Sequence, residues 1–299
     1  MPPEIARVES PGADLFQRVK SQNAPLILTG ALKDWKAISK WSLDYLSSRL
    51  GTTRVNVEVS DTNHFPTLHS DGSDAAGNLA AESVGTKRRT PIPIKRPSRQ
   101  VPFTEFADVV LRPNNGSEKF YLKDKLPTER FPDLASDISL GPLPGPTGQF
   151  PCRLWLSSAG AVTPLHYDVV HSLFAQVKGR KHFTLFAPRD GSSLYPFSMF
   201  SRYSYLSRVD ILQPDLREFP KFEQAKPVSF TLEPGEVLYL PAFWWHQVQS
   251  LETSISISWF WRVRLSQRLG WPSLRALPAA LTTRMESIVS RRQYSGGRK

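Results

Sequence analysis

Three side chains that commonly bind metal ions lie in apolar surroundings in the second half of the chain. His166 and Asp168 are one residue apart in the stretch TPLHYDVVHSLFAQV, and His246 ends the segment LPAFWWH. In a β-strand, residues i and i+2 face the same side, so we predict that His166 and Asp168 point into one cavity. His246 follows the predicted strand VLYLP, and a sheet that folds back on itself can bring it to the same cavity.

Two imidazoles and one carboxylate on one face of a metal ion are the ligand set of non-haem iron(II) oxygenases. Three protein ligands hold the iron, and three adjacent coordination positions are left for a co-substrate and dioxygen. The pattern by itself is weak evidence, because a His-x-Asp pair is common and His246 alone is also typical of a hydrogen-bonded core histidine. The elements around these residues have to decide between the two interpretations.

Short β-rich segments separated by turn signals fill the chain from about residue 150 onward. Such spacing predicts an all-β sandwich or barrel, and VKGRK and EPGE are the clearest turns between the segments. The predicted strands are RLWLSS, SLFAQV, HFTLFAP, VSFTL, VLYLP, HQVQSL and SISISWFW.

The chain before residue 150 mixes helical and extended patterns. Residues 13–50 predict a helix, a short strand at Leu26–Leu28 and a second helix that ends at Gly51. RVNVEVS and KFYLKD predict strands, whereas VPFTEFADVVL has helical spacing. Residues 61–100 are basic and rich in Pro, Gly and Ser, which predicts a long loop or insert.

These patterns predict three regions. Residues 1–100 form an N-terminal helix and strand region that carries the insert at about 61–100. Residues 101–265 form the β-rich core, and residues 266–299 form a C-terminal helical segment interrupted by Pro272 and Pro278.

The order of motifs resembles the JmjC-domain oxygenases. TPLHYDVVHSLFAQVKGRKHFTLFAP, then LYP, then LEPGEVLYLPAFWWHQVQSLETSISISWFW are similar to the hydroxylase-type branch that includes the asparaginyl hydroxylase of the hypoxia response. The upstream PLILTGALKDW and KFYLKD are similar to that branch as well. The resemblance covers roughly residues 20–60 and 101–265.

The resemblance implies a mainly β fold with flanking helices: a double-stranded β-helix, the jelly roll of cupins, with N-terminal α/β elements and C-terminal helices. It implies iron(II) as cofactor, with 2-oxoglutarate and O2 as co-substrates. His166, Asp168 and His246 match the metal ligands, and Lys181 matches the lysine that pairs with the distal carboxylate of 2-oxoglutarate. Thr163 and Tyr121 match hydroxyl positions that bind the same carboxylate, Tyr121 through the looser motif.

Two positions depart from the family pattern. Ser172 and, in our alignment, Trp259 replace asparagines that frame the co-substrate pocket in related hydroxylases. The replacements leave the shape of that pocket open, but the intact Asp168 argues against a halogenase.

We expect a dioxygenase that hydroxylates a protein side chain, with release of succinate and CO2. Three alternatives stay open: an N-methyl-lysine demethylase, an RNA or small-molecule oxygenase, and a non-catalytic cupin-like metal-binding module. Demethylases of this kind usually carry zinc modules, which the single cysteine, Cys152, cannot build. Lys181 argues against a pure binding module, because such a module needs no anchor for a co-substrate.

Bulk properties constrain partners and location. The chain has 299 residues and a formal net charge of +11. That charge is typical of a solvated basic surface and gives only weak support to nucleic acid as a partner. No apolar run suits a membrane span, and the N-terminus does not resemble a secretory signal. We expect an intracellular protein, cytoplasmic or nuclear, with a protein or peptide substrate, and a homodimer through the C-terminal helices is a hypothesis.

Overall fold

The computed structural model describes residues 4–9, 24–65, 98–111, 118–125, 132–138, 152–199, 201 and 203–263. Most of the basic insert and the C-terminal segment, with its dimer hypothesis, lie outside these residues. No helix in the described ranges is both long and apolar enough to span a bilayer. The elements are β1 (Ala6–Glu9), β2 (Leu26–Thr29), α2 (Lys36–Lys40), α3 (Leu43–Leu50), β3 (Arg54–Ser60), β4 (Ser98–Pro102), α4 (Phe103–Leu111), β5 (Lys119–Lys125), α5 (Pro132–Ser136), β6 (Arg153–Ser157), β7 (Val162–Tyr167), β8 (Val170–Lys178), β9 (Lys181–Phe186), β10 (Val228–Leu232), β11 (Val237–Leu240), β12 (Trp245–Ser250) and β13 (Ser254–Arg262), with short 3-10 turns at Pro188–Ser192 and Pro220–Gln224.

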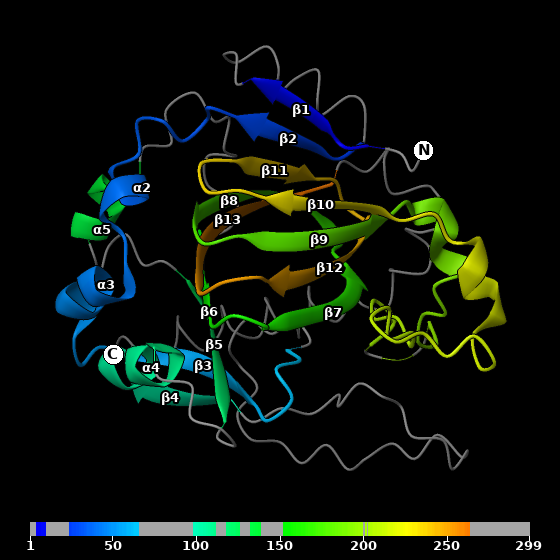
Figure 1. The fold of residues 1–299 in the computed structure, drawn as a ribbon, viewed down its shortest axis with the longest axis horizontal. Coiled ribbons are helices and arrows are strands. Elements are labelled where there is room, and N and C mark those ends of the chain that lie inside the picture. Colours follow the sequence, from blue (N-terminus) through cyan, green and yellow to red (C-terminus); the bar gives the residue numbers. More distant parts are fainter. Residues whose placement is uncertain are drawn as a thin grey trace, which may run out of the picture.

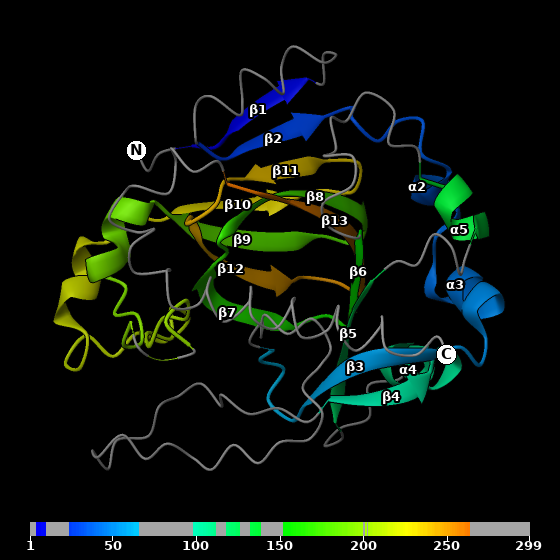
Figure 2. The ribbon, with the colours of Figure 1, turned by 180° about the vertical axis from the view of Figure 1, so that it is seen from behind.

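Two sheets face each other and form the predicted double-stranded β-helix (Figure 1). The small sheet has the order β10-β9-β12-β7, and the large sheet has the order β1-β2-β11-β8-β13-β6-β5-β3-β4. Seen from behind, the large sheet continues from β1 to β4 (Figure 2). The N-terminal strands β1 to β4 therefore extend the same sheet that carries the β-rich core. The predicted mainly β jelly roll with flanking helices is confirmed.

Apolar and polar side chains alternate along β13. The apolar ones face the core under the helices, and the polar ones face the space between the two sheets. Ile255, Ile257 and Trp259 belong to the outer core, between the large sheet and the helices. The intervening serines face the interior between the sheets, where Ser256 donates to the Gln176 side chain at 2.8 Å. Because side chains of a strand point alternately to its two faces, the segment SISIS supplies an apolar wall outside and a polar wall inside.

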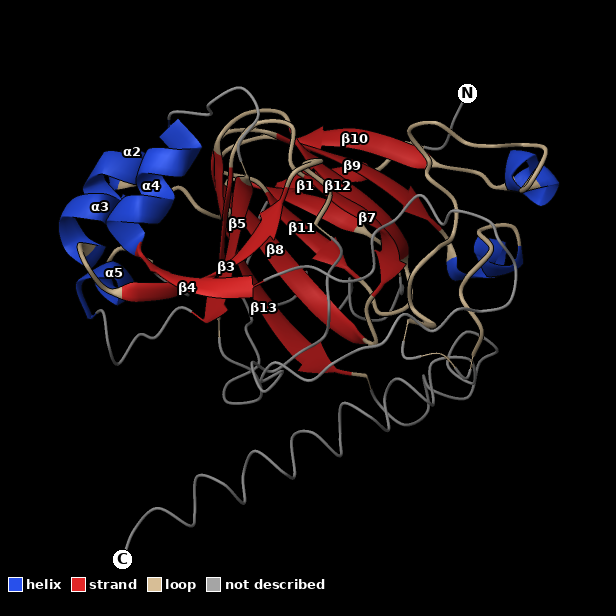
Figure 3. Cartoon of the chain, turned by 90° about the horizontal axis from the view of Figure 1, so that it is seen from below, coloured by secondary structure: helices blue, strands red, loops and turns tan. Residues whose placement is uncertain are grey.

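Helices α2 to α5 cover the outer face of the large sheet at one end (Figure 3). Their apolar side chains pack on strand residues in one cluster that includes Trp35, Leu46, Phe106 and Leu134. Ser42 begins α3 by accepting a hydrogen bond from the Tyr45 amide at 3.0 Å. Gly51, with φ of 51°, ends the helix in a backbone conformation that suits glycine.

Two local boundaries were predicted wrongly, and one strand was not predicted. Residues 98–100, which we assigned to the insert, belong to β4, an edge strand paired with β3. The helix predicted from residue 101 begins at Phe103. Strand β1, which has mostly exposed side chains and pairs in parallel with β2, was not predicted. Edge strands such as β1 and β4 carry charged and exposed side chains, so the period that identifies a half-buried strand is weak there.

Asp137, which follows α5, connects this helix to α2 and α3. Its buried carboxylate accepts hydrogen bonds from Lys40, Trp41 and Tyr45 at 3.1, 3.1 and 2.8 Å. Its backbone carbonyl accepts from the Ala37 amide at 3.0 Å. Burial by itself would raise the pKa of this carboxyl, but the hydrogen bonds from the three side chains outweigh it and lower the pKa.

We predict that Asp137→Ala lowers the free energy of unfolding by about 2–4 kcal/mol, because it leaves the buried Trp41 N–H without its acceptor. A group with a lowered pKa stabilises the fold above its unfolded value of about 4 and loses this effect as the pH falls. The deficit should therefore shrink in acid. Urea unfolding at pH 7 and pH 3.5 measures both effects, with Asp108→Ala, which removes an exposed carboxylate from α4, as the control. Equal stabilities of Asp137→Ala and wild type at pH 7 would contradict the role of Asp137.

Candidate metal and co-substrate site

The pairing of β7 with β12 contains a bulge that sets the orientation of the candidate ligands. His246 pairs with His166, whereas Val248 pairs with Thr163, so β7 has one more residue than β12 between these two pairs. Residues opposite each other in a pair share a face, and an extra residue lets Thr163 and His166, three apart, point the same way. Pro164 lies within this interval, and proline in sheets concentrates at bulges and edges. Both side chains therefore point between the two sheets.

The three predicted metal ligands come together. One potential ligand atom from each of His166, Asp168 and His246 lies within 4.8 Å of the others. The Nε2 atom of His246 is 3.8 Å from Asp168 Oδ2, and the two imidazole centroids are 4.0 Å apart. We predicted that Asp168 lies on the same strand as His166. This was wrong, because β7 ends at Tyr167. Its position is set instead by the turn to β8, where its carbonyl accepts from the Phe243 amide at 2.7 Å.

Backbone carbonyls select the tautomer of both histidines. His166 Nδ1 lies 2.7 Å from the Pro164 carbonyl, and His246 Nδ1 lies 3.0 Å from the Trp244 carbonyl. A carbonyl only accepts, so Nδ1 must carry the hydrogen and Nε2 the lone pair. Burial lowers the pKa of His246, although Asp168 and the Trp244 carbonyl oppose this effect. The neutral imidazole is the form that binds a metal ion, so the residues present fit iron(II) or a similar divalent ion.

We predict that His166→Ala weakens Mn(II) binding by more than about 100-fold, because even loss of a ligand's supporting partner can cost that much. Electron paramagnetic resonance titration of free Mn(II) measures the affinity. His182→Ala, a half-buried histidine whose neighbours on β9 face the interior, serves as the control. Equal Mn(II) affinity of His166→Ala and wild type would exclude His166 as a ligand.

Lys181 points into the same interior, away from solvent. It has no exposed surface, and its Nζ donates to the Tyr121 hydroxyl at 3.2 Å. On β12 its backbone partner is Ser250, four residues beyond His246, so Lys181 and the metal ligands lie at two levels of the interior between the two sheets, which we call the channel. No carboxylate among the described side chains lies within ion-pair distance of this ammonium. Burial and, to a smaller extent, the charge of Lys123 lower the pKa of Lys181 to about 7.

Tyr121 and Thr163, the two other predicted co-substrate residues, lie beside Lys181. Both are buried, and the Thr163 side chain is close enough to Tyr121 to lower its pKa, although burial has the larger effect. Burial raises the pKa of Tyr121, so its hydroxyl stays protonated. The structure thus brings one ammonium and two hydroxyls together at the level where the resemblance implies the distal carboxylate of 2-oxoglutarate.

Affinity for 2-oxoglutarate should therefore depend on pH. The carboxylate pairs with protonated Lys181, and in the empty site this form is lost as the pH rises through about 7. We predict full affinity below pH 7 and a loss that approaches about tenfold per pH unit above it, until the pKa of the complex is reached. Isothermal titration of the Mn(II)-loaded protein between pH 6 and 9 measures this, and a flat profile would show that Lys181 does not lose its proton in this range.

Of the two positions that differ from the family pattern, Ser172 faces the interior as predicted, but Trp259 does not. Ser172 is buried on the inward side of β8, opposite Phe260. Trp259, however, does not frame the pocket as our alignment implied: its ring packs against Trp35 at a centroid distance of 5.6 Å in the outer core. The adjacent Ser258 faces inward and accepts from the Trp155 indole at 2.6 Å. A one-residue difference in alignment exchanges the two faces of a strand.

Two further charged residues near the site were not predicted. Lys123 and Glu58 form an ion pair of 2.9 Å next to Tyr121. The signal was present in KFYLKD, because Lys123 is two residues from Tyr121 and so shares its face. The acidic partner comes from β3, and nothing in the sequence relates the two strands.

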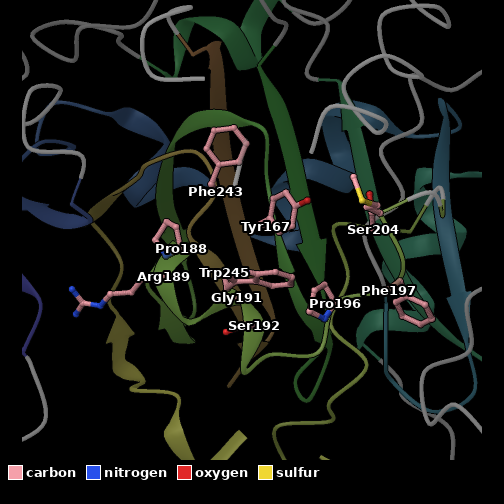
Figure 4. Close-up of a pocket in the computed structure, with 11 residues that line it drawn as sticks. Tyr167, Pro188, Arg189, Gly191, Ser192, Pro196, Phe197, Ser204, Phe243 and Trp245 are labelled. Atoms are coloured by element: carbon pink, nitrogen blue, oxygen red, sulfur yellow. The ribbon is translucent and has the colours of Figure 1, made fainter. Parts of the chain in front are cut away.

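A pocket of about 400 Å³ lies on the other side of the β7–β12 pair (Figure 4). Its wall includes Tyr167 and Trp245, which are direct sequence neighbours of the ligand histidines and therefore point to the opposite face. The two rings meet edge to face at 4.7 Å. Residues 188–204 supply most of the remaining wall. This pocket is therefore separate from the channel that holds the candidate ligands.

Comparison with known proteins agrees with the geometry. Residues 12–267 match the family model described as a cupin-like domain. The chain is 29% identical over 270 residues to the human bifunctional peptidase and (3S)-lysyl hydroxylase JMJD7, covering 80% of this chain and 77% of that protein. It is 29% identical over 241 residues to lysine-specific demethylase 8 of Xenopus tropicalis, covering 79% of this chain but 48% of that protein. A shorter region, 39% of the chain, is 43% identical to rat HSPB1-associated protein 1.

Proposed function

The chain belongs to the cupin-like family of JmjC oxygenases, and from this premise we propose that it hydroxylates a side chain of a protein substrate. The reaction would consume 2-oxoglutarate and O2 and release succinate and CO2. The chain spans about half the length of the demethylase 8 relative and about three quarters of JMJD7, so the activity and substrate of this chain rest on its own site.

The observation that carries the proposal is the fully buried ammonium of Lys181 in the same channel as the His-Asp-His set. A buried charge is favourable only when an anion pairs with it. A metal-binding module would need the three ligands but no second, cationic end. A diacid that chelates a metal at one end and carries a carboxylate at the other matches both ends of the channel.

Each residue then has a defined task. His166, Asp168 and His246 would hold iron(II), which when bound supplies the activation of dioxygen that couples decarboxylation of 2-oxoglutarate to hydroxylation of a C–H bond. Lys181 would bind the distal carboxylate, with Thr163 and Tyr121 as hydroxyl partners. The apolar cluster that includes Phe183, Leu185 and Val248 lies between the sheets and excludes water from the channel.

Demethylation of an N-methyl-lysine is the second candidate. It is supported by the relatives named as lysine-specific demethylases, of which the one from Arabidopsis thaliana, JMJ30, is 31% identical over 79% of the chain. The lysyl hydroxylase JMJD7 supports hydroxylation, and it shares a larger part of its own length with this chain. Both reactions use the same metal and co-substrate, so the site by itself does not discriminate between them.

We predict that the protein with added iron(II) converts 2-oxoglutarate to succinate, even without a protein substrate, and that Asp168→Ala reduces this conversion to background. Nuclear magnetic resonance of the reaction mixture measures both acids. Mass spectrometry of peptide products distinguishes the two reactions: hydroxylation adds one oxygen atom, whereas demethylation removes one methylene unit. Absence of succinate with wild-type protein that binds Mn(II) would favour the non-catalytic binding module.

Dimerisation through residues 266–299, a cytoplasmic or nuclear location and an RNA or small-molecule substrate stay predictions.

A further inference from the structure

Lys123 is a second lysine with a largely covered side chain, next to the predicted carboxylate subsite. Its side chain is 7% exposed, and its Nζ donates to Glu58 at 2.9 Å and to the Phe65 carbonyl at 3.3 Å. Because it is two residues from Tyr121 on β5, both side chains point toward the interior. Replacing a largely buried ion pair with apolar groups is often neutral or stabilising, so stability alone does not account for the Lys123–Glu58 pair, whose side chains are 7% and 20% exposed.

Tyr121 is close to two ammonium groups. Lys123 Nζ is 4.8 Å from the centroid of its ring, and Lys181 Nζ is 5.4 Å from the same centroid and 3.2 Å from its hydroxyl. An ammonium within about 6 Å of an aromatic centroid is attracted to the ring. Phe65 and Tyr121 also meet in an edge-to-face arrangement with their ring centroids 5.3 Å apart. These contacts restrict the ring, and its hydroxyl accepts a hydrogen bond from Lys181.

We propose that Lys123, held by Glu58, is a positioning residue for 2-oxoglutarate: it fixes Tyr121 against the carboxylate subsite and tunes the charge of Lys181. The proposal rests on the proposed function. With all three groups ionised, Lys123, Lys181 and Glu58 together carry one net positive charge, which one carboxylate neutralises. Loss of either member of the Lys123–Glu58 pair would shift this balance, in opposite directions.

The groups that face Lys181 from the neighbouring elements limit the alternatives. Tyr121 of β5 is its hydrogen-bond partner, Phe174 of β8 lies under its ammonium, and Leu232 and Ser250 are its backbone partners on β10 and β12. Next to Tyr121 lie Lys123, Thr163 and Glu58, of which Thr163 is uncharged. The metal ligands lie at the other level of the channel. Lys123 and Glu58 are the described charged side chains that adjoin Tyr121, the hydrogen-bond partner of Lys181: Lys123 contacts its ring, and Glu58 pairs with it across β3 and β5. The charge on Lys123 lowers the pKa of Lys181, second only to burial.

The test compares the pH dependence of 2-oxoglutarate binding in wild type, Lys123→Met and Glu58→Gln. Isothermal titration of the Mn(II)-loaded proteins between pH 6 and 9 gives the ratio of dissociation constants at pH 8.5 and pH 6.5. We expect this ratio to fall at least threefold in Lys123→Met, because Lys181 keeps its proton to higher pH. We expect it to rise in Glu58→Gln, because the charge of Lys123 is no longer balanced.

Two controls separate positioning from a structural effect. Lys123→Arg keeps the charge and should retain the wild-type pH profile, and Lys178→Met removes an exposed lysine from the same turn as Lys181 and should also retain it. Should Lys123→Met unfold, Glu58→Gln and Lys123→Arg still test the proposal. Parallel pH profiles in wild type, Lys123→Met and Glu58→Gln would overturn it, whatever the absolute affinities. No binding of 2-oxoglutarate to Mn(II)-loaded wild type would instead overturn the proposed function, and this inference with it.

Discussion

The pairing of β12 with β7 on one side and β9 on the other is the constraint on which the whole site depends. One strand places His246 beside His166 through the first pairing and Ser250 beside Lys181 through the second. The metal end and the carboxylate end are therefore held by the same backbone ladder. A shift of β12 by one residue would turn every side chain of this strand to the other face, and both ends of the channel would be lost at once.

The fold resists such a shift because the two faces of these strands have different partners. Inward side chains of β9 and β12 pack with β8, β10 and β11 in the cluster between the sheets. Outward side chains such as Tyr167, Phe186 and Trp245 form another cluster. Its further members include Leu194, Tyr205 and Leu206. Exchanging the faces would bury His246 and Lys181 among aromatic rings and open two apolar clusters, so packing on both sides specifies the register.

Many buried polar groups line the channel, and their type changes from the metal ligands to the Lys181 end. Near the metal ligands, backbone carbonyls orient two imidazoles. Near Lys181, the Tyr121 hydroxyl accepts from the ammonium, and the Lys123–Glu58 ion pair lies beside Tyr121. Beyond them, the hydroxyls of Ser157, Ser250 and Ser254 bond to one another at 2.7 to 3.3 Å. Small polar residues there satisfy each other without adding charge, so Lys181 and the Lys123–Glu58 pair dominate the electrostatics of this end.

The sequence by itself determined the ligand types, their approximate partners and the class of fold. His166, Asp168, His246, Lys181, Thr163 and Tyr121 could be selected from motifs, and alternation in segments such as SISISWFW predicted strands with one apolar face. Tertiary structure decided how these residues meet. The bulge at Pro164, the turn that orients Asp168, the outward direction of Trp259 and the pairing of Lys123 with Glu58 all depend on which strands are neighbours. Residues on separate strands interact only through that pairing, and a local pattern carries the period of one strand but not the register between two.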